Sequence, residues 1–199
     1  MKPAASIAVI DYGAGNLGNA RRAIEELGFP QQLVQSPADL EGDGPILLPG
    51  VGNYGAAMET LNGSGVAAAI RSAAGKGRRV VGICLGLQML FSRSEEAPGV
   101  PGIGILDGTV RRLRVTDQTL PHLGWCPVGR TATPLYFAHS YVVAPSDPSL
   151  VKATAEWGET FPAVVQQGQV VGFQFHPERS GDPGLDVLSR SLSGQDLRL

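Results

Sequence analysis

Cysteine is scarce in this sequence: of its 199 residues only Cys84 and Cys126 are cysteines, and they form no Cys-x-x-Cys pair. Two cysteines are too few for the disulfide framework of a small secreted domain. The three histidines, His122, His139 and His176, match neither His-x-x-x-His nor His-Glu-x-x-His. Because the ligand spacings typical of zinc are missing, we expect no metal ion, no redox pair and no bound cofactor.

An excess of charge of one sign and long apolar runs are also missing. The formal net charge is −2, with 16 basic and 18 acidic residues, so there is no electrostatic footprint for a nucleic acid or an anionic membrane. No window approaches the roughly 18 apolar residues that a membrane-spanning helix needs. The first residues are apolar over too short a stretch for a signal peptide, and we expect a cytoplasmic protein.

What is present in the first half is a regular alternation of strand and helix patterns. Strands are predicted by the short apolar runs at residues 6–10, 32–35, 45–48 and 79–83. Residues 17–27 and 66–74 carry apolar side chains at helical spacing, with Asn16 and Gly28 placed to cap the first helix. Strands that alternate with helices indicate a mostly parallel sheet that is covered by helices on both faces.

The second half changes to short alternating runs that are broken by glycine, proline and aspartate. Strand patterns cover residues 102–115, 124–128, 135–144, 151–157, 163–165 and 170–175, and a last helix covers residues 186–192. The last two strands flank residues 166–169, which are typical of a hairpin turn. We therefore expect a single α/β domain over residues 1–199, in which antiparallel strands extend the sheet or form a small separate one.

A cysteine stands where the predicted strand at residues 79–83 gives way to a helical pattern. Gly82-x-Cys84-x-Gly86 has the spacing of a nucleophile elbow, a tight strand-to-helix turn that lifts its central side chain out of the sheet. A helix N-terminus favours a thiolate over a thiol, and the N–H of Leu85 would point to where an oxyanion forms. The alternative is that Cys84 is a small buried apolar residue, and a partner base decides between the two.

The best candidate for that base lies near the end of the chain, where His176 and Glu178 follow the predicted strand at residues 170–175. In an extended chain, residues two apart face the same side, about 6.6 Å from each other, and Pro177 favours that conformation for His176. Glu178 would then orient the imidazole towards Cys84, which is the logic of a catalytic triad built on cysteine. In an open α/β sheet both groups would lie at the carboxyl edge, where ligands bind.

A glycine pattern near the start offers a rival function. Residues 13–18 match Gly-x-Gly-x-x-Gly after a predicted strand and before a helix, which is the fingerprint of a nicotinamide or flavin enzyme. The second strand, however, ends in Gln35-Ser36 without the acidic residue that binds a ribose. Of the other histidines, His139 lies in an apolar strand pattern and fits a core or supporting role, whereas His122 follows a proline in a predicted loop.

Motifs spread over nearly the whole chain give the sequence a resemblance to a known family. They are DYGAGNLGNA (11–20), LPGVGNYGAAM (48–58), GICLGLQMLF (82–91), PGIGILDG (101–108), PHLGW (121–125), YFAHSY (136–141) and GFQFHPERSG (172–181). The sequence resembles the cysteine-triad glutamine amidotransferases, and within them the glutaminase subunits of imidazole glycerol phosphate synthase. The resemblance implies a flavodoxin-like amidotransferase fold in which Cys84 attacks the glutamine carboxamide, His176 shuttles the proton and Glu178 orients His176. Glutamine would be hydrolysed to glutamate and ammonia.

The resemblance also implies roles for residues around the cysteine. Residues 49–52 would form the oxyanion strand, in which Val51 and Gly52 act together with Leu85. Glycines on both sides of Val51 make a peptide flip physically cheap, so that binding of a partner would switch the oxyanion donors into place. Contacts to the substrate glutamine are implied for Gly50, Gln88, Ser140 and Tyr141.

For a partner, the resemblance implies a (β/α)8-barrel cyclase that receives the ammonia and makes imidazole glycerol phosphate for histidine biosynthesis. Asn16 and Trp125 would face that partner in a heterodimer. The sequence departs from the family pattern after PHLGW, where Cys126 stands in place of the usual asparagine. Two alternatives keep the fold: a glutaminase that feeds another synthase, such as anthranilate synthase, and a regulatory or scaffold subunit without turnover.

Overall fold

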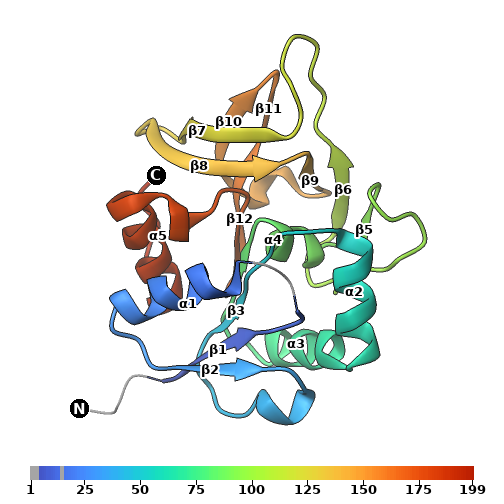
Figure 1. Ribbon diagram of the computed structural model, residues 1–199, viewed down its shortest axis with the longest axis vertical. Coiled ribbons are helices and arrows are strands. Elements are labelled where there is room, and N and C mark those ends of the chain that lie inside the picture. Colours follow the sequence, from blue (N-terminus) through green and yellow to red (C-terminus); the bar gives the residue numbers. More distant parts are fainter. Residues whose placement is uncertain (1–4, 14–15) are drawn as a thin grey trace.

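A seven-stranded sheet forms the centre of the molecule, in the order β10-β11-β12-β4-β3-β1-β2 (Figure 1). The computed structural model describes residues 5–13 and 16–199. The parallel strands are β1 (Ile7–Ile10), β2 (Gln31–Val34), β3 (Ile46–Leu48), β4 (Val80–Ile83) and β12 (Val170–Phe173). Antiparallel strands extend one edge, namely β10 (Val151–Trp157) and β11 (Glu159–Gln167). The predicted α/β sheet, mostly parallel with antiparallel strands from the second half, is confirmed.

Helices cover both faces of this sheet (Figure 1). On one face lie α1 (Leu17–Glu26) and α5 (Gly181–Ser193), and on the other lie α2 (Tyr54–Gly63) and α3 (Val66–Gly75). Successive residues of a strand point to opposite faces, so Ile7 of β1 packs with α1 and α5, whereas its neighbour Ala8 packs with α2 and α3. Burial on both faces explains why β1, β3, β4 and β12 carry no polar side chains, whereas the edge strand β2 begins with Gln31 and Gln32 and is only partly buried.

The second half of the chain also builds two smaller sheets. One contains β5 (Arg93–Ser94), β6 (Gly108–Arg112) and β9 (Tyr141–Pro145), and the other is the hairpin of β7 (His122–Val128) and β8 (Thr133–His139). The short helical segments are α4 (Leu85–Met89) and the 3-10 turns η1 (Pro37–Asp39), η2 (Pro148–Leu150) and η3 (Pro177–Arg179). Among the described residues, no helix is long and apolar enough to cross a membrane.

Two of the predicted strands differ from the observed ones by more than their ends. The strand predicted at residues 135–144 is interrupted at Ser140, because the chain there leaves its pairing with β7 and pairs with β6. The strand predicted at residues 102–115 is confined to β6, because residues 102–106 donate their backbone N–H groups to the carbonyls of residues 89–92. Both differences arise from the pairing of segments in the folded chain, which local alternation of apolar residues does not specify.

Helix α2 has no counterpart among the sequence predictions. Its apolar positions are interrupted by Gly55 and Gly63, which weakens the helical pattern. The helix begins at Asn53, whose side chain accepts a hydrogen bond from the N–H of Ala56 at 3.0 Å. An N-cap of this kind satisfies one of the free backbone donors of the first turn, so Asn53 is the start signal that the pattern of apolar residues does not reveal.

Helix α1 begins after Asn16, as predicted, but within the described residues the Asn16 side chain makes no capping bond to the helix backbone. The helix ends at Glu26, and Gly28 follows in the left-handed region with a φ of 75°. Of the glycine fingerprint at residues 13–18, Ala14 and Gly15 lie outside the described residues.

The carboxyl ends of β1, β3, β4 and β12 meet at one edge of the central sheet. The segments that follow these strands there contain Tyr12, residues 49–52, Cys84 and His176. Ligands of open α/β sheets bind at this edge, and the candidate residues of the sequence analysis gather there.

Candidate active site

Cys84 occupies the turn between β4 and α4. Its backbone N–H still donates to the carbonyl of Phe173 at 2.6 Å, so the residue continues the pairing of β4 with β12. Its φ of 51° and ψ of −107° lie in a region that side-chain-bearing residues rarely adopt, and such strain clusters at functional sites. The flanking glycines allow the turn, because a Cβ on Gly86 would lie 1.8 Å from the carbonyl oxygen of Leu48.

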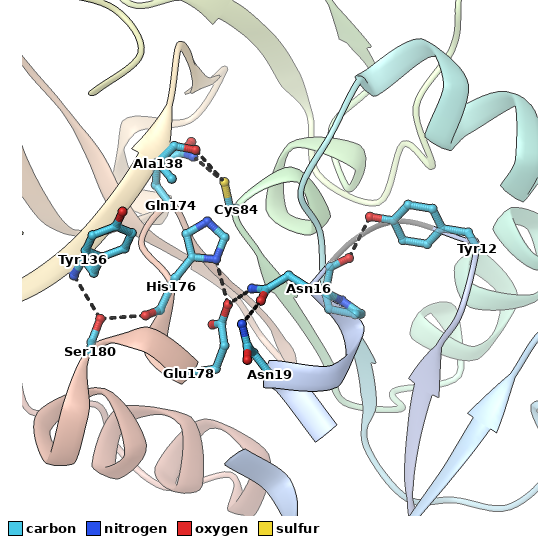
Figure 2. A network of polar contacts seen from close by, with 11 residues as sticks. Tyr12, Asn16, Asn19, Cys84, Tyr136, Ala138, Gln174, His176, Glu178 and Ser180 are labelled. Carbon is cyan, nitrogen blue, oxygen red and sulfur yellow. Dashed lines mark hydrogen bonds and ion pairs between the residues drawn. The ribbon is translucent and has the colours of Figure 1, made fainter. Parts of the chain in front are cut away.

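The backbone of His176 is held by hydrogen bonds to two neighbouring segments. Its N–H donates to the carbonyl of Tyr136 on β8 at 2.8 Å, and its own carbonyl accepts from the hydroxyl of Ser180 at 2.6 Å. The same hydroxyl oxygen accepts from the N–H of Tyr136 at 2.9 Å, which closes the network in Figure 2. The imidazole is 1% exposed, so its position is set by the fold and not by solvent.

Glu178 contacts His176 as the sequence predicts, although the backbone between them differs from the prediction. The Nδ1 of His176 lies 2.8 Å from Oε1 of Glu178. His176 itself is extended, as predicted, with a φ of −102° and a ψ of 94°. The expectation that the extended chain continues to Glu178 is wrong, because Pro177 opens the 3-10 turn η3 and this turn carries the carboxylate back to the imidazole. Proline suits that first position, since its fixed φ matches a helical turn and its missing N–H is not needed there.

Asn16 points towards the triad candidates, which the sequence pattern does not reveal. Its Nδ2 donates to Oε1 of Glu178 at 2.5 Å, so one carboxylate oxygen serves both Asn16 and His176. The Nδ2 of Asn19 in turn donates to Oδ1 of Asn16 and fixes the orientation of its amide. Residues at the start of α1 thereby support the carboxylate at the end of the chain (Figure 2).

The electrostatics of the pair favour a charged imidazole. Figure 2 shows the ring of His176 between Cys84 and Glu178. Burial alone lowers the pKa of His176, but the sulfur of Cys84 and the carboxylate of Glu178 together raise the pKa to about 10. The Nε2 of His176 has no hydrogen-bond partner within the described part of the chain, which leaves this nitrogen available for a reacting group.

A network of buried amides surrounds the sulfur of Cys84. Nε2 of Gln174 lies 3.6 Å from the sulfur, and Oε1 of Gln174 accepts from Nε2 of Gln88 at 3.2 Å. Nε2 of Gln88 also donates to the carbonyl of Tyr141 at 2.9 Å. The sulfur itself lies 3.8 Å from the carbonyl oxygen of Ala138. Gln174, which directly follows β12, is a site residue that the sequence analysis missed, because a glutamine at the end of an apolar strand carries no local signal of its contact with Cys84.

A cavity of about 210 Å³ opens beside Cys84. It is lined by Val51, Gly52, Cys84, Leu85, Gln88, Glu96, Pro121, Ala138, His139, Ser140 and Tyr141. Most of the residues predicted to bind substrate or an oxyanion are therefore brought together here. Among the described residues, no group of three His, Cys, Asp or Glu side chains is arranged to hold a metal ion.

The N–H of Leu85, which the sequence analysis expects to face an oxyanion, is already engaged. It donates to the carbonyl of Gly50 at 3.3 Å. Gly50 therefore lies against the turn that holds Cys84, and its carbonyl occupies the donor that an anionic oxygen would use. The geometry shown is one in which this candidate oxyanion donor is blocked by the chain itself.

His139 and His122 form a second buried pair beside the cavity. Nε2 of His139 lies 3.3 Å from Nδ1 of His122, and Nδ1 of His139 lies 3.0 Å from the carbonyl oxygen of Tyr141. Burial lowers the pKa of His122 to about 4, and burial together with the charge of His122 lowers the pKa of His139 to about 3. The prediction of a loop position for His122 is wrong: it is the first residue of β7, fully buried and stacked on Trp157 at 4.1 Å.

Trp125 lies on the outer face of β7. Trp125 is 57% exposed and Leu123 is 61% exposed, and residues two apart on a strand face the same side. The ring of Trp125 meets the edge of Tyr136 at 5.9 Å, and the guanidinium of Arg179 lies 4.1 Å from the centre of the Tyr136 ring. Large exposed aromatic residues of this kind are common anchors of protein interfaces.

The profile of the glutamine amidotransferase class-I family matches residues 8–192 of the chain. The chain belongs to this family. The resemblance to the glutamine amidotransferases that the motifs indicate is thereby confirmed.

Relatives of this amidotransferase carry a more specific name. Proteins named imidazole glycerol phosphate synthase subunit HisH occur in Moorella thermoacetica and Geobacillus kaustophilus. The first is 41% identical over 193 residues, which cover 92% of this chain and 91% of the relative. The second is 42% identical over 198 residues, which cover 92% and 94%. The Arabidopsis thaliana protein named imidazole glycerol phosphate synthase hisHF, chloroplastic, is 40% identical over 94% of this chain but only 34% of its own length.

Solved structures share the fold of the amidotransferase at lower sequence identity. A crystal structure of a glutamine amidotransferase superposes with a TM-score of 0.76 at 22% identity, covering 94% of this chain and 98% of the other. PurLQS from Thermotoga maritima gives a TM-score of 0.71 at 22% identity and covers 96% and 95%. At this level of identity the likeness shows the fold alone.

Proposed function

We propose that this amidotransferase is the glutaminase subunit of an imidazole glycerol phosphate synthase. It hydrolyses glutamine to glutamate and ammonia and passes the ammonia to a (β/α)8-barrel cyclase in histidine biosynthesis. The observation that carries the proposal is Cys84 on a strained turn beside the buried pair of His176 and Glu178. Relatives that are 41% and 42% identical and named as this subunit support the choice of synthase.

In the proposed first step, the sulfur of Cys84 attacks the carboxamide carbon of glutamine and the carbonyl oxygen becomes an oxyanion. The raised pKa of His176 means that its imidazole holds a proton at neutral pH. Nε2 gives this proton to the departing ammonia as the carbon–nitrogen bond breaks, which leaves a thioester on Cys84. His176 then takes a proton from water, the hydroxide attacks the thioester, and glutamate leaves as the thiolate is restored.

The proposed substrate site is the cavity beside Cys84. Gln88, Ser140 and Tyr141 line it and supply polar groups for the amino-acid end of glutamine, with Gly50 nearby. The cavity is small and its floor is fixed by buried amides, which favours a ligand bound in a single orientation. Positioning of the carboxamide against the sulfur is itself a large part of catalysis.

The oxyanion site requires a rearrangement in this proposal. Turning the peptide between Gly50 and Val51 would withdraw the Gly50 carbonyl from Leu85 and aim the N–H of Val51 towards Cys84. Both N–H groups would then face the oxyanion, and such donors are worth about 10²–10³ in rate. Glycine at positions 50 and 52 makes the turn sterically cheap, since Gly52 already has a φ of 119°. We propose that binding of the cyclase drives it.

The proposed partner surface includes the outer face of β7 with Trp125. Asn16 lies at the start of α1 and links that region to Glu178, so contact with a partner there would reach the triad. The Arabidopsis relative supports a physical association, because this chain matches 34% of a longer protein with the name of the whole synthase.

The proposal is tested with the chain bound to the cyclase subunit of the same organism and its nucleotide ligand. We expect glutaminase activity that Cys84→Ala abolishes and that Cys126→Ala, the other buried cysteine, preserves. An electrophilic glutamine analogue should label Cys84 alone. Activity that survives Cys84→Ala, or labelling at Cys126, would contradict the triad.

A separate experiment distinguishes the partner. Affinity purification from the native host should recover a barrel cyclase with the tagged chain. A chorismate-using subunit in its place would identify a glutaminase of another synthase. Recovery of the cyclase without any glutaminase activity of the complex would instead indicate a scaffold subunit.

A further inference from the structure

Tyr12 holds the segment that leads into the proposed oxyanion strand. It follows β1 at the carboxyl edge of the sheet, and its hydroxyl donates to the carbonyl of Pro49 at 2.9 Å (Figure 2). The side chain is only 9% exposed. Tyr12 belongs to the motif DYGAGNLGNA, but neither the resemblance nor the proposed mechanism gives a role to its hydroxyl, which contacts the chain next to Gly50.

Two hydrogen bonds from different parts of the chain hold residues 49 and 50 in place. The Pro49 carbonyl faces the Tyr12 hydroxyl, and the next carbonyl, of Gly50, faces the N–H of Leu85. The backbone of Gly50 lies close both to Tyr12 and to the turn after Cys84, because a Cβ there would lie 2.7 Å from the Tyr12 oxygen and 2.7 Å from the backbone nitrogen of Gly86.

We propose that Tyr12 is a positioning residue that holds the peptide between Gly50 and Val51 in its resting orientation. This inference rests on the proposed function, in which that peptide must turn before an oxyanion can be stabilised. When the peptide turns, the Gly50 carbonyl leaves the N–H of Leu85 and comes within reach of the Tyr12 hydroxyl, whose oxygen is only 2.7 Å from the Cβ position of Gly50. There it meets a hydroxyl whose single proton is already donated to Pro49.

The hydroxyl has only that one proton to give. Burial raises the pKa of Tyr12 and the nearby charge of Cys84 raises it further, so the group stays neutral around pH 7. If the Gly50 carbonyl also approaches the Tyr12 hydroxyl, its oxygen faces a lone pair of the hydroxyl oxygen. Either the Pro49 carbonyl or the Gly50 carbonyl is then left without a hydrogen-bond donor. A buried carbonyl without a donor is unfavourable, and the Tyr12 hydroxyl therefore opposes the turn.

A second cavity explains why removing the hydroxyl would release the strand. It has a volume of about 280 Å³ and is lined by Tyr12, Val51, Gly52, Ala57 and Thr60, among others. Val51 and Gly52 therefore lie between this cavity and the one beside Cys84. In Tyr12→Phe, water from this side can enter the vacated space. A water molecule has two protons, so it can donate to both carbonyls after the turn.

The test compares Tyr12→Phe with the parent chain, with and without the cyclase. We expect the glutaminase kcat without partner to rise about five-fold, the effect of one buried hydrogen bond. The kcat at saturating partner and the KM for glutamine should stay within about two-fold, so the stimulation by the partner falls about five-fold. Alkylation of Cys84 by iodoacetamide should keep its rate, because this displacement forms no oxyanion.

A measurement without turnover keeps the two proposals separate. The amide hydrogen of Leu85 should exchange about five-fold faster in Tyr12→Phe, because its bond to the Gly50 carbonyl opens more often. Tyr54→Phe is the matched control: its hydroxyl is buried and has no hydrogen-bond partner among the described residues. Tyr54→Phe should change neither the amide hydrogen exchange of Leu85 nor the stimulation of glutaminase activity by the cyclase.

Equal exchange of Leu85 in Tyr12→Phe and the parent would overturn the role of Tyr12, whatever the glutaminase assay shows. So would an unchanged stimulation factor, or a loss of kcat at saturating partner. Failure of the proposed function has a different signature, namely a parent complex that hydrolyses no glutamine or whose activity survives Cys84→Ala.

Discussion

Nδ1 of His176 lies 2.8 Å from Oε1 of Glu178, and each side chain is only 1% exposed. Shielding from water strengthens a hydrogen bond of this kind electrostatically. The carboxylate holds one imidazole nitrogen, so the other is the nitrogen presented to Cys84 (Figure 2). The pair therefore fixes the tautomer of the neutral imidazole as well as the orientation of the ring.

Glu178→Gln tests this relationship because it keeps the shape and removes the charge. A neutral amide stabilises the imidazolium less well and can select the wrong tautomer. We expect the partner-stimulated kcat to fall about a thousandfold or more, with little change in the KM for glutamine. Steady-state glutaminase assays of the complex measure both constants, and a kcat within tenfold of the parent would contradict the role of the carboxylate.

Asn16→Ala removes the second donor to the same carboxylate oxygen. Because Asn16 orients Glu178 and does not hold the imidazole itself, the expected loss of kcat is smaller, about tenfold, and the free energy of unfolding falls by about 1 kcal/mol. Asn62→Ala, at an exposed position of α2, is the control and should change neither. A loss of stability with an unchanged kcat would show that Asn16 serves the fold alone.

The core of this site is predictable from the sequence because its signals are local. The glycines around Cys84 predict a tight turn at the carboxyl end of a strand. A histidine that directly follows an apolar strand is predicted to lie at the same carboxyl edge of the parallel sheet. Chain topology then brings together Cys84 and His176, since β4 and β12 are neighbours. The residues that support the carboxylate are not predictable in this way. Asn16 and Glu178 are 162 positions apart, and no sequence pattern in either segment predicts their contact.

The orientation of the peptide after Gly50, which decides whether the oxyanion site is formed, cannot be predicted from the sequence either. The motif at residues 49–52 is consistent with either orientation of the peptide after Gly50, because glycine tolerates both. Which orientation is populated depends on the donors that the fold places on each side, here Tyr12 and Leu85. Such a choice between tertiary hydrogen bonds has no counterpart in periodicity or spacing.

The buried pair of His122 and His139 predicts a loss of stability in acid. In the unfolded chain both protonate near pH 6.5, whereas in the folded protein the pKa values are about 4 and about 3. Between these values the unfolded state binds more protons, so the free energy of unfolding falls as the pH decreases below about 6.5. At pH 5 the loss is at most about 2 kcal/mol for each histidine.

Urea denaturation between pH 7 and pH 4.5 measures this loss. His122→Phe keeps an aromatic ring in the stack between Phe137 and Trp157 and removes one of the two titrating groups. Its stability should therefore decline less steeply with acid than that of the parent. If the free energy of unfolding fell equally steeply with decreasing pH in His122→Phe and the parent, these histidines would not be the cause of the loss of stability in acid.

Gly86→Ala should unfold the turn that carries Cys84. The added Cβ would lie 1.8 Å from the carbonyl oxygen of Leu48, which is part of a central strand and cannot move aside. We expect a loss of more than about 2 kcal/mol in the free energy of unfolding. Gly75→Ala at the end of α3 should change the stability by less than about 1 kcal/mol, because its added Cβ would meet no described atom within 4 Å outside its own helix turn. Similar stabilities of the two variants would contradict the close approach.

Trp125→Ala should weaken the partner complex without weakening the fold. The side chain is 57% exposed, so its truncation removes little buried surface from the free subunit and should leave the unfolding transition unchanged. A central aromatic anchor is typically worth about 2 kcal/mol or more, which corresponds to a rise in Kd of about thirtyfold. Titration calorimetry with the cyclase measures this, and Leu33→Ala provides the control, because Leu33 is another exposed apolar residue but lies on β2 at the far edge of the sheet. Equal Kd values for the two variants would place the interface elsewhere on the amidotransferase, since only a surface that includes β7 makes Trp125 matter more than Leu33.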